Sequence, residues 1–367
     1  MDENSPPTRP SLATPGAKGQ DRVRAAFEAR DYELIGELGR GGMGVVYLAQ
    51  HKKLGRRVAI KTLTPDRQTK ENSILRFQRE ARTFAQIRHP HIANLYEFQD
   101  AGPVQFLALE YVEGTDLEKE RRKNHRWSCE EVAKMIGNIA DALDHTHKKG
   151  ILHRDIKPGN ILIERGTNRV VLTDFGLAKG EQDDTLTASG FAVGTPAYMA
   201  PEQITDQFGG KPDGRADIFS LGTVAYEMLT HKHPFLAADD LNTMRNIVNG
   251  KLPPLREADS SIPEELCIIV ESMLVKNPKD RVADAGTLAR KLSEWLAGRD
   301  ASGTPRVVSA SQHPAAPVNP SQPSLTAATR TSIDVPGMST KKLVIIIAIV
   351  VVVTLAVGIG VGLMVSS

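Results

Sequence analysis

The sequence predicts an α+β protein with two lobes, a small antiparallel β-lobe containing one helix and a larger helical lobe, followed by one membrane-spanning helix. Short β-rich runs dominate the first part of the globular region, after about Asp31. Beyond Tyr111, apolar residues recur every three or four positions, as on the buried face of a helix. An uncharged apolar stretch occupies residues 343–365.

Composition excludes several classes of protein. The chain has 367 residues, of which 40% are hydrophobic and 25% charged, and this balance rules out a wholly disordered chain and a polytopic membrane protein. Because 46 basic residues oppose 44 acidic ones, the net charge is +2, so we expect no nucleic-acid partner. Cys129 and Cys267 are too few for a disulfide framework and indicate reduced thiols in a reducing compartment.

Residues 1–30 form the predicted disordered N-terminal segment. Pro, Gly, Ser and Thr are scattered through it without an apolar period, so it buries too little surface to offset the entropy of ordering. It contains no succession typical of a secretory signal, and Asp2 excludes myristoylation. We therefore expect the folded part to lie in the cytoplasm.

The predicted globular domain covers residues 31–298. Its β-lobe contains five β-rich runs, at residues 32–38, 44–50, 56–63, 92–99 and 104–112. One helix is expected at residues 71–87, because Ile74, Phe77, Ala81 and Phe84 form one apolar stripe. A second stripe, Val132, Ile136, Ile139 and Leu143, marks the first long helix of the larger lobe.

Residues 299–340 are rich in Pro, Ser, Thr and Ala and predict an extended juxtamembrane linker. The 23 uncharged residues 343–365 make about 35 Å of helix, enough to cross a hydrocarbon core of roughly 30 Å. A buried core helix is the alternative, but only Ser366 and Ser367 follow to pack around it. Lys341 and Lys342 fit the positive-inside tendency. We expect a single-pass, C-terminally anchored membrane protein.

Two motifs of the β-lobe suggest phosphate binding. Residues 39–46 read G-R-G-G-M-G-V-V, and glycines at this spacing let backbone N–H groups approach phosphate oxygens. A strand rather than a helix follows, which excludes a dinucleotide-binding Rossmann unit. Lys61 ends the apolar run 58–61 and needs a counter-charge, for which charge alone does not choose between Glu80 and Glu71.

Two further motifs follow in the helical lobe, H-R-D-I-K-P-G-N at residues 153–160 and D-F-G at residues 174–176. With the glycine-rich loop, V-A-I-K at 58–61 and A-P-E at 200–202, they stand in an order that closely resembles the eukaryotic-type protein kinase family, in its bacterial membrane-anchored serine/threonine branch. The resemblance covers about residues 32–296. It implies the two-lobed protein kinase fold and transfer of the γ-phosphate of ATP to Ser or Thr hydroxyls of protein substrates.

The resemblance also assigns catalytic roles to residues of this sequence. Asp155 accepts or orients the proton of the substrate hydroxyl, and Lys157 neutralises charge on the transferring group. Lys61 holds the α- and β-phosphates and is locked by Glu80, which matches the family glutamate in the pattern R-F-x-R-E-A at residues 76–81. Positioning and charge neutralisation dominate such a transfer.

The implied cofactors are ATP and Mg²⁺, with Mn²⁺ as a substitute. Asn160 and Asp174 offer the hard oxygen ligands that Mg²⁺ prefers. The predicted ATP-binding residues are Leu38, Gly39, Gly41, Gly44, Val46, Ala59, Lys61, Glu110, Val112, Asp116 and Leu162. Among them, Glu110 and Val112 offer backbone groups to the adenine edge and Asp116 reaches the ribose. Val46, Ala59 and Leu162 enclose the ring.

Substrate class and regulation follow from neighbouring residues. Lys157, two residues after Asp155, is the serine/threonine pattern, and Thr195 resembles the family residue that bonds both of them at the substrate site. Arg154 offers a positive charge that a phosphate on the following loop neutralises. The candidate phosphorylation sites are Thr185, Thr187 and Ser189, and autophosphorylation makes a second copy of the chain a partner.

Two residues resemble structural members of the family. Asp217 is expected to hold the backbone of the catalytic loop, and Arg281 to pair with Glu202. A membrane-tethered pseudokinase scaffold is the main alternative function, although such scaffolds usually lack one of the motif residues present here. A small-molecule phosphotransferase is disfavoured by the intact segment 194–202, which seats a polypeptide in protein kinases.

Overall fold

A computed structural model describes residues 17–41, 44–63, 78, 81–82, 84–99, 104–123, 125–175, 196–209 and 211–299 of the chain. The chain divides into two compact units, residues 1–307 and 308–367, and all described residues belong to the first. Outside the described residues lie Glu80, Thr185, Thr187, Ser189 and Thr195, most of the predicted helix 71–87, and the predicted linker and membrane span beyond Arg299.

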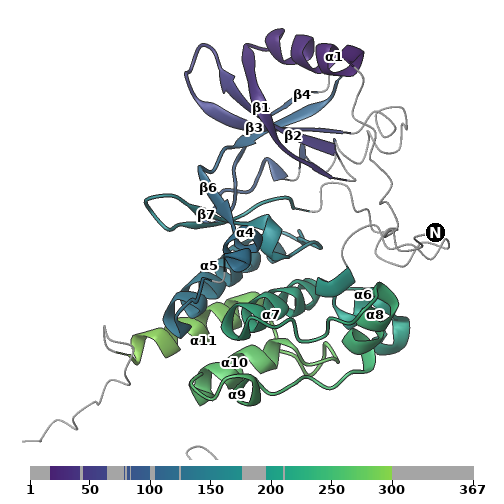
Figure 1. The fold of residues 1–367 in the computed structure, drawn as a ribbon, viewed down its shortest axis with the longest axis vertical. Helices are drawn as coiled ribbons and strands as arrows, with labels where there is room; N and C mark the ends of the chain where they lie inside the picture. The colour runs from purple at the N-terminus through teal and green to yellow at the C-terminus, as the bar shows by residue number, and fades with distance from the viewer. Residues whose placement is uncertain are drawn as a thin grey trace, which may run out of the picture. The chain divides into compact units, whose positions relative to one another are not determined.

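The β-lobe is a five-stranded antiparallel sheet in the order β1-β2-β3-β5-β4 (Figure 1). Its strands are β1 (Tyr32–Gly41), β2 (Gly44–His51), β3 (Arg57–Leu63), β4 (Leu95–Gln99) and β5 (Phe106–Glu110). Each strand overlaps one of the five predicted runs, so this part of the prediction is confirmed. The strands alternate: Val58 and Ile60 are fully buried on the face of β3 that packs with Tyr47 and Phe106.

A helix at the N-terminus, α1 (Ala17–Glu28), lies across this sheet (Figure 1). Disorder was therefore the wrong prediction for residues 17–28. Phe27 is fully buried, with its ring centroid 5.6 Å from Tyr47 and 5.1 Å from Phe106 in edge-on contacts, and Val23 packs against the same cluster. The helix has few apolar residues of its own, and the sheet supplies the surface that orders it.

A second, three-stranded sheet follows, in the order β6-β7-β8. Its strands are β6 (Gly114–Asp116), β7 (Ile161–Glu164) and β8 (Val170–Leu172). Leu172 also forms a parallel bridge with Ile92, and the N–H of Ala93 donates to the carbonyl of Leu172. The segment before β4 is thus bonded directly to this second sheet.

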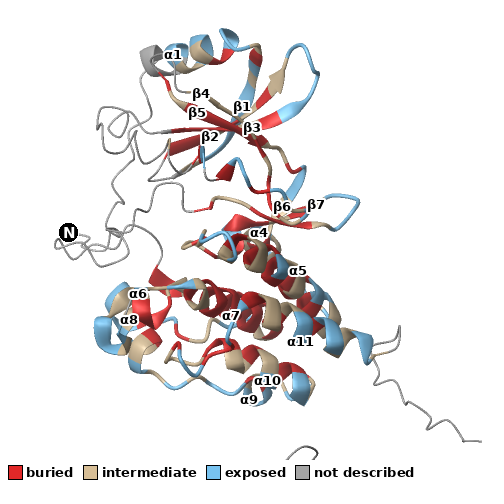
Figure 2. Cartoon of the chain, turned by 180° about the vertical axis from the view of Figure 1, so that it is seen from behind, coloured by how far each residue is buried: buried red, intermediate tan, exposed pale blue. Residues whose placement is uncertain are grey.

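The helical lobe is built around α7, which is buried along most of its length, and α5, which buries one face (Figure 2). The helices of this lobe are α4 (Leu117–Arg122), α5 (Cys129–His147), α6 (Pro201–Ile204), α7 (Gly214–Thr230), α8 (Asp240–Asn249), α9 (Leu255–Ala258), α10 (Glu264–Met273) and α11 (Ala285–Ala297). Short 3₁₀ turns lie at η1 (Pro158–Asn160), η2 (Pro196–Tyr198) and η3 (Asp206–Phe208).

Local sequence explains where α5 begins and which face it buries. Ser128 caps the helix by accepting a hydrogen bond from the N–H of Glu131, whose side chain returns to the N–H of Ser128. The predicted stripe Val132, Ile136, Ile139 and Leu143 is buried, which confirms it.

Of the predicted helix 71–87, the described residues Ala81, Phe84 and Ile87 are buried in the same core cluster. No helix among the described residues is long and apolar enough to span a bilayer.

Candidate active site

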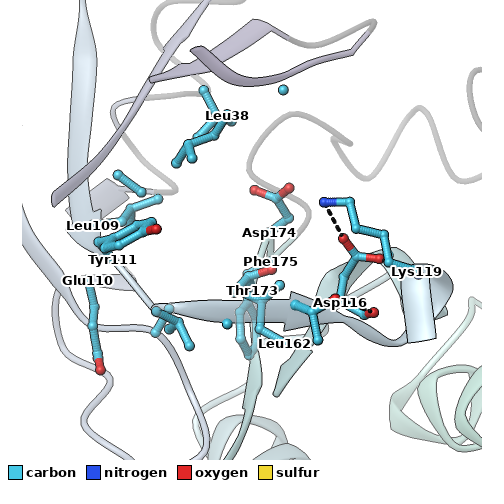
Figure 3. A pocket seen from close by; sticks show the side chains of 18 of the residues that line it. Leu38, Leu109, Glu110, Tyr111, Asp116, Lys119, Leu162, Thr173, Asp174 and Phe175 are labelled. Atoms are coloured by element: carbon cyan, nitrogen blue, oxygen red, sulfur yellow. Dashed lines mark hydrogen bonds and ion pairs between the residues drawn. The ribbon is translucent and has the colours of Figure 1, made fainter. Parts of the chain in front are cut away.

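A cavity of about 300 Å³ lies between β1–β3 and the second sheet (Figure 3). It is lined by Leu38, Gly39, Val46, Ala59, Phe84, Ala93, Leu109, Glu110, Tyr111, Val112, Gly114, Thr115, Asp116, Lys119, Gly159, Leu162, Thr173, Asp174 and Phe175. Most of the predicted nucleotide-binding residues are therefore brought together here. Gly41 and Gly44 face each other where β1 meets β2, and Gly44 is not among the residues given above for the cavity lining.

Strand register explains the apolar walls of this cavity. Along β3, Val58 and Ile60 face the core beneath α1, so Ala59 and Lys61 point the other way, toward the cavity side. Val46 pairs with Lys61 in the neighbouring strand. Leu162 of β7 lines the cavity from the second sheet. An apolar slot with a charged group at one end suits a flat heterocycle that carries phosphates.

Lys61 and Asp174 form an ion pair beside this cavity. The Nζ of Lys61 lies 2.7 Å from Oδ1 of Asp174, and Lys61 is only 8% exposed. The charge of Lys61 holds the pKa of the Asp174 carboxyl below its usual range. Asp174 has φ +56°, in the left-handed region. The next residue, Phe175, is buried against Phe84, with ring centroids 5.0 Å apart.

Asp155 is held by two neighbours of its own motif. The ammonium of Lys157 donates to Oδ2 of Asp155 at 2.8 Å, and Nδ2 of Asn160 donates to the same oxygen at 3.0 Å. Asn160 also donates to the backbone carbonyl of Asp155 at 2.7 Å. These bonds fix the carboxylate next to a cation, as expected for a group that orients a hydroxyl and a partner that neutralises phosphate charge.

Asp217 holds the backbone of this loop from beneath. Its carboxylate accepts hydrogen bonds at 2.8 Å from the N–H of His153, the N–H of Arg154 and Nε2 of His147. Arg154 has φ +63°, so these bonds maintain a conformation that a side chain other than glycine seldom adopts. Burial alone raises the pKa of Asp217, but the hydrogen bond and charge of His147 lower it on balance. The predicted role of Asp217 has a direct structural basis.

His153 links the two halves of the site. Its Nε2 is 2.9 Å from the carbonyl oxygen of Thr173, and its Nδ1 accepts the N–H of Asp155 at 3.2 Å. Burial lowers the pKa of His153, so the ring is neutral and donates from Nε2. His153 thereby connects the residue before Asp174 with Asp155.

Glu202 and Arg281 form a buried ion pair, as predicted. Nη1 and Nη2 of Arg281 lie 2.7 and 3.0 Å from the two carboxylate oxygens of Glu202, a bidentate arrangement. Arg281 also donates to the carbonyl of Arg215, at the start of α7. The pair therefore joins α6 to the helix that carries Asp217.

Asp116 lines the cavity, but its carboxylate is already engaged. Oδ1 accepts the N–H of Lys119 at 2.8 Å and so caps α4, while Oδ2 lies 3.0 Å from the Lys119 ammonium (Figure 3). A ribose hydroxyl would share this carboxylate with Lys119. Sequence reasoning did not single out Lys119 or Ala93, and no motif marks either residue.

The hard oxygen donors of Asp174 and Asn160 are of the kind that a divalent metal prefers, and each residue bonds a charged residue of the site, Lys61 and Asp155 respectively. Among the described residues, no three His, Cys, Asp or Glu side chains are grouped as in a metal site built from protein alone. Mg²⁺ in phosphoryl-transfer sites is typically held by one or two protein oxygens together with phosphates and water. The donor set is of that kind.

Comparison with known proteins identifies the family. The model of the protein kinase domain family matches residues 32–293, so this chain belongs to the protein kinase family. It is 34% identical over 270 residues to a probable serine/threonine-protein kinase, pknA2, of Bifidobacterium longum, covering 72% of this chain and 35% of that protein. It is 35% identical over 283 residues to the serine/threonine-protein kinase PknA of Mycobacterium tuberculosis, covering 76% of this chain and 64% of that protein.

A solved structure shows the same fold. The kinase domain of Mycobacterium tuberculosis PknI superimposes with a TM-score of 0.57 at 28% identity, covering 72% of this chain and 96% of that domain. The chain thus spans between about a third and two thirds of the length of the two curated relatives. Helix α1 precedes the residues matched by the family model.

Proposed function

We propose that this chain is an active serine/threonine protein kinase that transfers the γ-phosphate of ATP to hydroxyl groups of protein substrates. The observation that carries the proposal is the convergence of Lys61, Asp174 and the Asp155–Lys157–Asn160 cluster beside one apolar cavity. Family membership and similarity to serine/threonine kinases of other bacteria support it.

The chemistry needs little covalent work from the protein. The substrate hydroxyl oxygen bonds to the γ-phosphorus, the bond to the β–γ bridging oxygen breaks, and ADP leaves with that oxygen. Asp155 orients the hydroxyl and takes its proton, while Lys157 offsets negative charge on the transferring group. Bound Mg²⁺, held by Asn160 and Asp174, supplies charge neutralisation of the phosphates. Mn²⁺ is a chemically similar substitute.

Nucleotide binding is proposed to use both ends of the cavity. Backbone groups of Glu110 and Val112 pair with the adenine edge, and Val46, Ala59 and Leu162 enclose the ring. At the other end Lys61 holds the α- and β-phosphates. When nucleotide binds, the Lys61 ammonium leaves Asp174 and bonds phosphate oxygens. In the proposal taken from the family pattern, it then also pairs with Glu80.

Three further parts of the proposal rest on the sequence. Thr195 bonds Asp155 and Lys157 at the substrate site, and a second copy of the chain phosphorylates Thr185, Thr187 or Ser189 on the loop that follows Asp174. Residues 343–365 anchor the kinase domain to the inner face of the membrane through the linker 299–340.

Transfer of radiolabelled phosphate from ATP to a generic basic protein tests the proposed activity, with Mg²⁺ and Mn²⁺ supplied in turn. We expect Asp155→Asn and Lys61→Met to lower the rate by about 10³-fold, because a positioned proton acceptor and a phosphate ligand are lost. Asp206→Asn and Lys232→Met, at exposed positions, are the matched controls and should transfer at the wild-type rate. A folded wild-type protein that binds nucleotide but transfers no phosphate would instead be a pseudokinase scaffold.

Autophosphorylation is tested separately by mass spectrometry of the wild-type protein and of Asp155→Asn. Phosphate is expected on Thr185, Thr187 or Ser189 of the wild-type protein alone. Phosphate on these residues of the variant, or none on the wild-type protein, would contradict this part of the proposal.

A further inference from the structure

Arg169, the residue before β8, lies at the joint between the two sheets. We propose that Arg169 is a positioning residue for the nucleotide, which it serves by fixing the end of β5 relative to β7. Arg169 is not itself one of the lining residues of the cavity, and it belongs to none of the motifs described above. The proposal deepens the proposed function and rests on it.

One guanidinium group joins three segments of the chain. Nη2 of Arg169 lies 2.5 Å from Oε1 of Glu110, at the end of β5, and 3.1 Å from Oε1 of Glu164, at the end of β7. Its Nε donates to the second oxygen of Glu164 at 3.2 Å. Nη1 donates to the carbonyl of Pro90 at 3.0 Å, in the segment before β4. The planar fork of arginine is needed to reach three acceptors at once.

The Glu110 side chain is fully used in this arrangement. Its second oxygen accepts the N–H of Asn94 at 3.1 Å and the side-chain amide of Asn94 at 2.7 Å. The N–H of Glu110 donates back to the carbonyl of Asn94 at 2.8 Å. In Figure 3 the Glu110 carboxylate points away from Asp174 and the cavity. The side chain of Glu110 therefore holds the Glu110 backbone in place, and the backbone is the part of this residue that is proposed to bind the nucleotide.

Electrostatics keep the pair intact. The side chains of Arg169 and Glu110 are only 25% and 14% exposed, so solvent screens their attraction less than at an open surface. Burial alone raises the pKa of Glu110, but the hydrogen bonds from Arg169 and Asn94 lower it on balance, so the carboxylate is charged.

Both surfaces that Arg169 connects are parts of the cavity wall. Glu110 lines it at the end of β5, and Leu162 lines it from β7, two residues before Glu164. Glu164 in turn pairs with Gly114 of β6, another lining residue. Arg169 thus ties the adenine-pairing edge to the surface beneath the ring through side chains, in addition to the backbone bonds that join Ala93 and Leu172. A shift of about an ångström between two such surfaces weakens binding strongly.

The test compares Arg169→Ala and Arg169→Lys with Arg165→Ala as a matched control. Arg165 lies in the same hairpin, but its side chain is 78% exposed. Its ion pair with Glu113 is long, with 3.7 Å between the two charged atoms. For Arg169→Ala we expect KM for ATP to rise about tenfold, with kcat and KM for the protein substrate changed less than about twofold. Arg169→Lys, which retains one cation, should recover part of the affinity. Arg165→Ala should match the wild-type protein.

A double-mutant cycle with Glu110→Ala, which keeps the backbone of that residue, shows whether Arg169 acts through Glu110. The two affinity losses should be clearly less than multiplicative in the double variant. A fall in kcat for all substrates with an unchanged KM for ATP would overturn the proposal. So would a double variant whose loss of ATP affinity equals the product of the two single losses. If Arg169→Ala fails to fold, Arg169→Lys and Glu110→Ala decide by the same criteria.

Affinity for a fluorescent ADP analogue, measured beside the melting temperature, separates this proposal from the proposed function. Should the wild-type protein bind ADP but transfer no phosphate, the proposed function fails while the affinities of the Arg169 variants still test positioning. A loss of melting temperature in Arg169→Ala without loss of ADP affinity would show a purely structural role and overturn the proposal.

Discussion

The ammonium of Lys61 lies 2.7 Å from the carboxylate of Asp174, 113 positions later in the chain. The pair joins β3 of the first sheet to the segment that follows β8 of the second. Each group is the other's counter-charge in a place where an unpaired charge is costly. The same two groups are those proposed to hold phosphates and metal, and in this structure they neutralise each other.

Removing one partner of this pair should therefore harm stability as well as activity. Lys61→Met leaves Asp174 without its cation, and we expect a loss of about 1–2 kcal/mol at pH 7, since the Asp174 side chain is 37% exposed and partly screened. The double variant Lys61→Met/Asp174→Asn removes both charges and should regain most of that loss. Urea unfolding at pH 7 measures both. A single variant as stable as the wild-type protein would show that the pair contributes nothing.

The acid response of the same variant follows from the lowered pKa of Asp174. A carboxylate with a folded-state pKa below its unfolded value stabilises the protein above the unfolded pKa, and this stabilisation is lost as pH falls through the folded pKa. The wild-type protein should therefore lose its advantage over Lys61→Met as pH falls from about 5 toward 3. A difference in unfolding free energy that stays constant over this range would contradict this expectation.

Asp217 should be more sensitive to substitution than Asp213, the N-cap residue of α7. An amide has one oxygen where the carboxylate accepts three hydrogen bonds, so Asp217→Asn should cost about 3 kcal/mol and lower phosphate transfer together with stability. Asp213→Asn is the control, because asparagine caps a helix as well as aspartate does and the residue is exposed, so its cost should stay below about 1 kcal/mol. Equal effects of the two changes on the melting temperature would be inconsistent with this account.

Helix α1 should contribute to the stability of the β-lobe. Phe27 is fully buried between Tyr47 and Phe106, so Phe27→Ala should lower the unfolding free energy by about 3–5 kcal/mol. Glu28→Ala, at the next and exposed position, should change it by less than about 0.5 kcal/mol. Chemical denaturation of both variants provides the comparison. If Phe27→Ala unfolds like the wild-type protein, α1 is not part of the folded domain.

The contrast between α1 and α5 shows what sequence patterns reveal. The stripe from Val132 to Leu143 carries its own apolar period, so both the helix and its buried face were predictable. Among the described side chains of α1, Phe27 and Val23 make the contacts to the apolar cluster, and the surface that orders them belongs to strands later in the chain. A local pattern holds no information about that surface, which is why the segment was predicted to be disordered.

The site divides in the same way. Motif order predicted the grouping of Asp155, Lys157 and Asn160, since these residues are neighbours in sequence and their bonds are local. Arg169 follows a turn and has no periodic or motif signal, and its partner Glu110 lies 59 positions earlier. Contacts of that kind depend on how two sheets meet, which no single segment specifies.

Membrane attachment of the full chain is expected from residues 343–365. The protein should sediment with membranes and remain there after alkaline carbonate extraction, whereas a chain ending at residue 340 should be released. Val351→Arg places a charge at the middle of the apolar stretch, at a cost of about 2.5–3.5 kcal/mol, and should weaken insertion. Ala315→Arg, in the linker, is the control. Full-length protein that stays in the supernatant when membranes are sedimented, or that carbonate releases from them, would contradict the proposed anchor.

The pH dependence of stability should contain a contribution from His233. This residue lies beside Tyr198, with ring centroids 5.1 Å apart, and burial lowers its pKa to about 4. The unfolded chain binds a proton near pH 6.5 that the folded protein does not accept until about pH 4. The unfolded state therefore gains protons first, and stability falls as pH decreases from about 6.5 to 4, by about 2–3 kcal/mol.

His233→Asn keeps a side-chain acceptor for the N–H of Phe235, which Nδ1 of His233 accepts at 3.2 Å, but it does not titrate. Urea unfolding of the wild-type protein and this variant at pH 7.5 and 4.5 isolates the contribution, since all other acid-sensitive groups are shared and cancel in the difference. The variant should lose about 2–3 kcal/mol less than the wild-type protein on acidification. His125→Asn, at an exposed position, should behave like the wild-type protein. If His233→Asn loses as much stability as the wild-type protein, His233 is already protonated in the folded state and its surroundings accommodate the charge.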